Sequence, residues 1–253
     1  PRCTSSAASD VYKRQSPSGL KFKSNNIENL LSVESRWQSW LDVEASMARS
    51  QSELKMIPRK VGNKIAKNCN LKKLNLKNIY RDLKITGHKL VPLIWELSRV
   101  CDKDSKKYVH WGGTTQNIVS NGDILILRKI HKIFLNDLSD LLKILSKLSL
   151  KTKNDLMAGR THGQHALPIT FGYKVACWID EISRHIERIK ESEPRVFKCI
   201  FGGAVGTSAS FGKYGNKLQK KISIKLGLNS SRIPTRSHLA VSYTHLTLPT
   251  MYT

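Results

Sequence analysis

The feature that most constrains this chain is a long, unbroken helical repeat. Apolar side chains recur every seven residues between Asp123 and Leu150, at Leu127, Phe134, Leu141 and Leu148. Leu138 and Leu145 follow the middle two by four residues and extend the same stripe. Such a repeat predicts an amphipathic helix whose apolar stripe faces another helix. About 28 residues at about 1.5 Å each give a rod on the order of 40 Å long, which needs partners of similar length.

The sequence supplies further helices but no clear strand. A matching apolar stripe follows, at Phe171, Val175, Trp178, Ile179, Ile182, Ile186 and Ile189, and ends near Pro194. An earlier helix runs from about Trp37 to Pro58, and another from about Tyr80 to Leu97, where Pro92 either kinks the helix or opens a new first turn. No stretch alternates like a strand between turns, so we predict an all-α fold.

We divide the chain into four segments. Residues 16–105 are expected to form an N-terminal helical domain, and residues 106–240 a truncated central domain of long bundled helices. Residues 1–15 lack hydrophobic periodicity, and residues 241–253 are rich in Thr and lack Lys, Arg, Asp and Glu. Both end segments look like translated sequencing-adapter sequence, so we exclude them from fold reasoning and expect the chain to be a fragment.

Composition narrows the classes of function. The 253 residues carry 43 Lys and Arg against 19 Asp and Glu, a formal charge of +24. Such a positive charge is typical of proteins that bind nucleic acid. The lysines are scattered, however, and no recognition helix, zinc module or stacking motif accompanies them. The stripe at 124–150 is interrupted by charges, so no membrane span is predicted. Five cysteines without regular spacing favour a reduced, cytoplasmic protein without structural zinc.

The first candidate site lies just before the long helix, in YVHWGGTTQN at residues 108–117. Gly112 and Gly113 allow close approach to the backbone, and Thr114 and Thr115 offer hydroxyl and N–H donors at a helix start. These residues fit a carboxylate-binding cradle. An ordinary glycine turn with Thr as the N-cap is the alternative.

The second candidate site is GRTHGQHALP, residues 159–168, which joins the two long helices. It concentrates hydrogen-bond donors and proton-transfer groups, namely Arg160, Thr161, His162, Gln164 and His165. Histidine exchanges protons readily near neutral pH. No carboxylate or third His stands at metal-binding spacing, so we predict no metal, and a structural role for either His is the alternative.

A third segment, FGGAVGTSASFG at residues 201–212, is rich in small residues. It has the look of a phosphate-binding loop but matches neither a P-loop nor the dinucleotide fingerprint. Close packing of helices explains its small residues equally well.

These three motifs, in this order and spacing, resemble the fumarase/aspartase lyase superfamily, in particular adenylosuccinate lyases and 3-carboxy-cis,cis-muconate cycloisomerases. WLDVEASMARSQSELKMIP, at residues 40–58, is similar to the first helix of that family. The likeness covers about residues 25–240. It implies an all-α homotetramer around a bundle of very long helices, with no cofactor and with active sites that each draw residues from three subunits.

The resemblance also implies a chemistry. Most members cleave a C–N or C–O bond by anti β-elimination of a dicarboxylate substrate and release fumarate, whereas the cycloisomerases close a muconate to a lactone. By resemblance His162 is the general acid that protonates the leaving nitrogen, and His88 assists it. The substrate-binding residues implied are His110, Thr114, Thr115 and Gln164.

Two departures from the family pattern affect the expected activity. Asn117 and Ser120 stand where the family usually has Asp, which weakens the expected network around the loop. The family's catalytic Ser lies in a loop of the form S-S-x-M-P-x-K-x-N, and no such string occurs here. We therefore expect this polypeptide to be inactive alone, while its gene encodes a lyase.

Within the superfamily the motifs point in two directions. His162 and GGAVGT favour an adenylosuccinate-lyase-type elimination, which is our prediction. Trp111 and QHALPITFG favour the cycloisomerase, which stays the alternative. A basic helical nucleic-acid-binding protein is the remaining, non-enzymatic reading.

Overall fold

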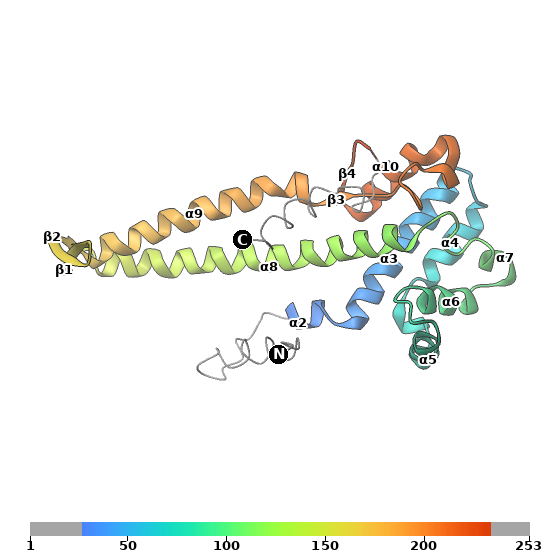
Figure 1. The fold of residues 1–253 in the computed structure, drawn as a ribbon, viewed down its shortest axis with the longest axis horizontal. Coiled ribbons are helices and arrows are strands. Elements are labelled where there is room, and N and C mark those ends of the chain that lie inside the picture. Colours follow the sequence, from blue (N-terminus) through green and yellow to red (C-terminus); the bar gives the residue numbers. More distant parts are fainter. Residues whose placement is uncertain (1–26, 234–253) are drawn as a thin grey trace, which may run out of the picture.

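Two long antiparallel helices project as an arm from a helical head (Figure 1). The computed structural model describes residues 27–233, so the end segments 1–15 and 241–253 lie outside the described residues. The arm consists of α8 (Thr115–Lys151) and α9 (Phe171–Val196). The predicted pair of long helices is confirmed, and α8 begins eight residues before Asp123, where the helix was expected to start, at the first candidate site.

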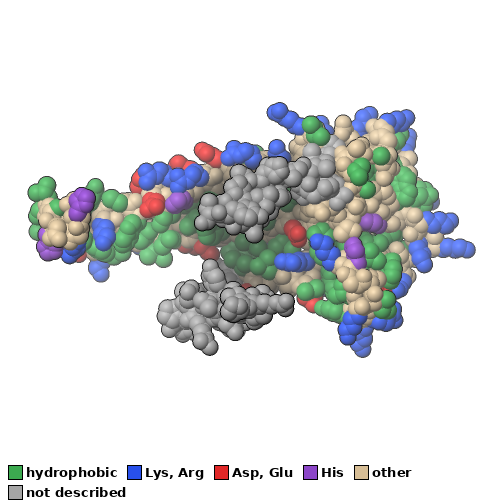
Figure 2. Space-filling view, in the orientation of Figure 1, with side chains coloured by type: hydrophobic (Ala, Val, Ile, Leu, Met, Phe, Trp, Pro, Cys, Tyr) green, Lys and Arg blue, Asp and Glu red, His purple; other side chains and the backbone are tan. Residues whose placement is uncertain are grey.

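The arm buries only part of its apolar surface. Val175 and Ile186 of α9 are buried against α8, and Leu138 and Leu145 of α8 are half-buried. Other apolar side chains of the arm face solvent, and these are Leu127, Phe134, Leu141, Ile144, Leu150, Tyr173, Trp178 and Val196. Figure 2 shows apolar side chains along the arm, with charged side chains between them. Such a surface is typical of a helix pair that packs against further helices.

The mostly helical fold is confirmed, but the expectation that no strand occurs was wrong between α8 and α9. There β1 (Leu156–Thr161) and β2 (Gln164–Thr170) form an antiparallel hairpin at the tip of the arm (Figure 1). Its two central residues, His162 and Gly163, have φ values of +48° and +75°, as a type I′ turn requires. Both strands are largely exposed, so no in-out hydrophobic alternation marked them in the sequence.

The head is built from the shorter helices on both sides of the arm. Before the arm come α2 (Ile27–Leu30), α3 (Val33–Glu53), α4 (Arg59–Asn68), a 3₁₀ turn (Leu71–Lys73), α5 (Leu76–Thr86), α6 (Val91–Val100) and α7 (Lys103–Lys106). After it come β3 (Lys198–Cys199), a 3₁₀ segment (Ala209–Tyr214), α10 (Gly215–Leu226) and β4 (Asn229–Ser230), which pairs with β3 in parallel. Of the two roles open to Pro92, the structure shows the new first turn, in α6.

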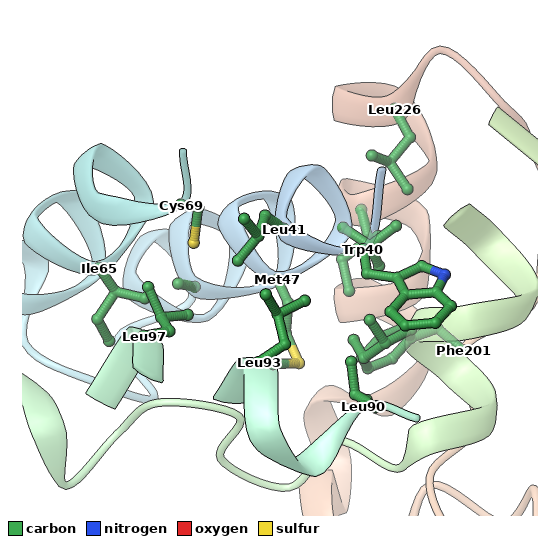
Figure 3. Close-up of a cluster of buried hydrophobic side chains, with 14 of the residues drawn as sticks. Trp40, Leu41, Met47, Ile65, Cys69, Leu90, Leu93, Leu97, Phe201 and Leu226 are labelled. Atoms are coloured by element: carbon green, nitrogen blue, oxygen red, sulfur yellow. The ribbon is translucent and has the colours of Figure 1, made fainter. Parts of the chain in front are cut away.

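The core of the head is one apolar cluster centred on α3 (Figure 3). Leu41 and Met47 of α3 meet Leu93 and Leu97 of α6, and Phe201 enters from the chain beyond the arm; all five are fully buried or nearly so. Helix α10 also packs against α3. One core therefore contains residues from both sides of the boundary predicted at 105/106, and that boundary stays a prediction.

Two buried asparagines near the start of α8 tie it to the chain that follows the arm. The Asn121 amide donates to the Ile200 carbonyl at 2.8 Å, and its Oδ1 accepts from the Ile200 N–H at 3.1 Å. Asn117 Oδ1 accepts from the Gly203 N–H at 3.1 Å. Both side chains are almost fully buried. These bonds fix the 201–212 loop against the first turns of α8.

Within residues 27–233, no helix combines the length and the apolar character needed to cross a bilayer. This finding agrees with the charges that interrupt the α8 stripe.

We expect the chain to self-associate through the arm, because each exposed Leu or Phe there forgoes roughly 1.5–3 kcal/mol of burial. The measurement is sedimentation velocity together with binding of an apolar dye. The double variant Phe134→Asp/Leu141→Asp should sediment as a smaller species. The control Ser139→Asp places one such charge on an exposed polar position of α8 and should leave association unchanged. A wild-type chain that melts cooperatively as a compact monomer without binding dye would contradict this expectation.

Replacing Asn121 by Ala should lower the free energy of unfolding by about 2 kcal/mol, because it removes the partner of the N–H and C=O of the half-buried Ile200. Urea unfolding at fixed protein concentration measures the effect. Ser139→Ala is the control, since that hydroxyl makes only an exposed bond to the Leu135 carbonyl within the same helix. Equal stability of the two variants would show that the asparagine bonds do not anchor the loop.

Candidate functional site

The residues before α8 form a tight turn whose shape depends on backbone conformations that most residues avoid. His110 has φ +58° and Gly112 has φ +70°. A Cβ on Gly112 would come within 2.6 Å of the Phe211 ring, so this glycine is needed both for its conformation and for the close approach of the 201–212 loop. Two of the three sequence motifs are therefore in contact.

Thr114 and Thr115 lie at the N-terminus of α8, as predicted. Thr114 is the N-cap, with extended backbone, but its side chain makes no capping hydrogen bond. Thr115 is the first helical residue, and both side chains are half-buried. The hydroxyl of Thr114 is thus available beside the first N–H groups of the helix, an arrangement that suits a carboxylate.

A buried carboxylate contacts one ring nitrogen of His110. Its Nδ1 lies 2.5 Å from Glu44 Oε1, and the Glu44 side chain is only 1% exposed against 22% for His110. Burial alone would lower the pKa of His110, but the charge and the hydrogen bond of Glu44 outweigh it and raise the pKa above its ordinary value. The imidazole is therefore biased toward its cationic form.

Helix α3 supports the rest of the same turn. The fully buried Gln51 side chain donates to the Trp111 carbonyl at 2.8 Å. The Met47 sulfur lies close to Gly113, since a Cβ built there would be 3.3 Å from it. Glu44, Met47 and Gln51 thus form one face of α3, and that face holds the turn from His110 to Gly113.

The loop 201–212 is packed into the head. Phe201 and Phe211 are buried and in ring contact, with centroids 5.6 Å apart. A Cβ on Gly215 would come within 2.4 Å of the Ser208 Cβ, which shows close packing at the start of α10. Of the two alternatives for this segment, the contacts therefore favour packing over a phosphate-binding loop.

His88 lies at the start of α6 and is half-buried. Its Nδ1 accepts hydrogen bonds from the N–H groups of Leu90 and Val91, at 3.2 and 3.1 Å. His88 therefore satisfies two N–H groups at the start of α6 from two residues before the N-cap, Leu90. A ring that accepts at Nδ1 carries its proton on Nε2, which leaves Nε2–H for another partner.

His162 and Gln164 lie far from these residues, in the exposed hairpin at the tip of the arm (Figure 1). His165 faces Arg160 across the hairpin, with 3.5 Å between their nitrogens. The 37 residues of α8 separate the tip from Thr115 by about 55 Å, at about 1.5 Å per residue. The structure brings His110, Thr114 and Thr115 together and places His162 and Gln164 at the opposite end.

Sequence reasoning missed Glu44, and its expectation for Asn117 stays a prediction. Glu44 lies among the apolar positions of the helix that begins near Trp37, and an acid on such a face was the signal that could have revealed it. Asn117 was expected to weaken the network around the loop. Its amide oxygen nevertheless accepts the Gly203 N–H, so that contact does not need a carboxylate. Within residues 27–233, no group of three or more His, Cys, Asp or Glu could hold a metal ion.

Comparisons with known proteins identify the family of the chain. The family model described as Lyase matches residues 14–247. N-acetyl-S-(2-succino)cysteine lyase of Enterococcus italicus is 38% identical over 216 residues, which is 85% of this chain and 47% of that protein. Adenylosuccinate lyase of Pyrococcus abyssi is 36% identical over 217 residues, 86% of this chain and 48% of that protein.

Solved structures match at the level of the whole fold. A fumarate lyase from Mesorhizobium sp. BNC1 superposes with a TM-score of 0.80 at 32% identity, covering 89% of this chain and 52% of that one. The 3-carboxy-cis,cis-muconate lactonizing enzyme of Pseudomonas putida gives a TM-score of 0.77 at 29% identity, covering 83% and 48%. The chain spans about half the length of these relatives. The family model covers most of the chain, and the helical fold agrees with it: the chain belongs to the fumarase/aspartase lyase superfamily.

Proposed function

We propose that a protein carrying this chain is a lyase that eliminates the leaving group of a succinyl-type substrate and releases fumarate, in the manner of an adenylosuccinate lyase. The observation that carries the proposal is the division of the candidate site residues between the two ends of one rigid arm. A substrate cannot touch Thr115 and His162 of the same chain across about 55 Å. The site is therefore composite, and the tip of one subunit reaches the head of another within a homotetramer.

The residues in the head would bind the substrate. Elimination needs a base to remove a weakly acidic proton beside a carboxylate, and the resulting dianion needs fixed donors. Thr114 and Thr115, at a helix N-terminus, supply such donors, and His110 adds a cation in the same turn. The base is expected in the family's Ser loop, which these 253 residues do not contain.

The residues at the tip would complete the reaction. A general acid has to protonate the leaving atom so that it does not depart as an anion. His162 is exposed at the apex of the hairpin and can enter another subunit's site, with Gln164 beside it. His88, with its free Nε2–H, would assist from a head.

The substrate class rests on the relatives. The names of two of them, a succinocysteine lyase and an adenylosuccinate lyase, share a succinyl group attached to different leaving atoms, S and N. The cycloisomerase stays the second candidate, because two muconate-lactonizing enzymes match the fold at 29% and 26% identity.

Replacing His162 by Ala in the full-length protein should lower kcat by about 10² to 10⁴, with little change in KM, because the residue acts on the leaving group rather than on binding. Steady-state kinetics with adenylosuccinate and with a succinylated cysteine measure both constants and identify the leaving group. An alkaline shift of the pH optimum with little loss of rate would instead move the acid role to His110 or His165.

Mixing two inactive variants tests the composite site. Subunits with His162→Ala lack the tip function, and subunits with Thr114→Val/Thr115→Val lack the head function. In randomly mixed oligomers about one quarter of the sites combine an intact head with an intact tip, so co-expression should restore about one quarter of the wild-type activity. Each variant expressed alone is the control. Failure to recover activity would contradict a site shared between copies.

A further inference from the structure

The head contains a buried acidic residue that contacts His110 directly. Glu44 lies in the middle of α3, its side chain is 1% exposed, and its Oε1 lies 2.5 Å from His110 Nδ1. A buried carboxylate is costly unless a cation or several donors compensate it. Among the described residues, His110 is the hydrogen-bond partner of the Glu44 side chain and can supply that compensation as an imidazolium.

We propose that Glu44 is a positioning residue of the active site, which holds His110 as a cation whose Nε2–H pairs with an anionic group of the substrate. This inference rests on the proposed lyase function and adds a role to it. It separates the histidines into two classes. His110 binds charge, whereas His162 transfers a proton.

The local geometry favours positioning over a simple structural tie. His110 adopts a left-handed backbone, φ +58°, which costs energy in a residue other than glycine. Its ring lies against Gly113, since a Cβ there would be 3.3 Å from His110 Cε1. With Nδ1 engaged, Nε2 has no hydrogen-bond partner among residues 27–233, and 22% of the side chain stays exposed. The ring is thus fixed on one side and open on the other.

Glu44 is the neighbouring charged group that influences the protonation of His110. A Cβ built on Gly113 would lie 3.3 Å from both the Met47 sulfur and His110 Cε1, so uncharged groups lie on that side of the ring. Glu44 is the charged group that acts on the pKa of His110. Burial disfavours the cation, and the Glu44 carboxylate overrides it and raises the pKa of His110. An imidazolium has no lone pair to accept a proton, so His110 cannot act as the base while this pair is intact.

The test replaces Glu44 by Gln, which keeps the size and hydrogen-bonding capacity of the side chain and removes its charge. We expect the pKa of His110, followed by NMR of the imidazole and assigned with His110→Gln, to fall below its ordinary value, because the charge of Glu44 no longer opposes the effect of burial. In the full-length protein KM should rise about 10- to 100-fold at pH values above that lowered pKa, as a charge-assisted hydrogen bond is lost. Below it KM should approach the wild-type value, and kcat should change little throughout.

Two further variants make the result specific. Glu53→Gln removes a carboxylate from the same helix, but Glu53 bonds Lys221 and Lys225 of α10 and should leave the His110 titration unchanged. His110→Gln keeps a hydrogen bond to Glu44 without a cation and should raise KM at every pH.

Three outcomes would overturn the inference. The first is an unchanged His110 titration in Glu44→Gln, and the second is a KM increase in that variant that is the same at every pH. The third is a His110→Gln enzyme with the KM of the wild type. Absence of fumarate release by the wild-type protein would instead contradict the lyase proposal, because the imidazole titration reports on the pair without turnover.

Discussion

The rigid length of α8 is the constraint on which the rest of this structure depends. Thirty-seven helical residues hold the head and the hairpin about 55 Å apart, and no hinge glycine or proline lies in the exposed middle of the helix. A chain built this way cannot fold its two ends onto one substrate. In the lyase that we propose, the tip would lie in a neighbour's site, and the incompletely covered apolar surface of the arm would provide the contact between neighbours. Assembly and catalysis would then depend on the same two helices.

The head has a different structural role, because it holds one small turn in a fixed conformation. Three side chains of α3, Glu44, Met47 and Gln51, hold this turn on one side, and Phe211 packs against Gly112 on the other. The strained backbone of His110 persists because these contacts determine it from several directions. A donor group fixed before the substrate arrives needs no reorganisation during the reaction, which is the advantage of building a binding site on packed helices rather than on a free loop.

Local periodicity was enough to predict the long helices, since a stripe such as Phe134, Leu141 and Leu148 has one simple explanation. The hairpin was missed because its strands are exposed on both faces and its turn uses His162 before Gly163 instead of the common Asn-Gly or Asp-Gly. The motifs named His110, Thr114 and His162 as a group, but their distribution over two ends depends on the path of the arm, which no local pattern contains. Glu44 was missed for a related reason: its meaning depends on a partner 66 residues away.

The replacement of a carboxylate by Asn117 is consistent with this electrostatic arrangement. Asn117 is 1% exposed and accepts one backbone hydrogen bond from Gly203 through Oδ1. An ionised Asp at this position would add another buried negative charge to the head, and a single neutral N–H would compensate little of its desolvation. The amide keeps the acceptor and avoids that cost. The loop is therefore oriented by neutral hydrogen bonds. In the lyase that we propose, such bonds would not compete with an anionic substrate for the His110 ring.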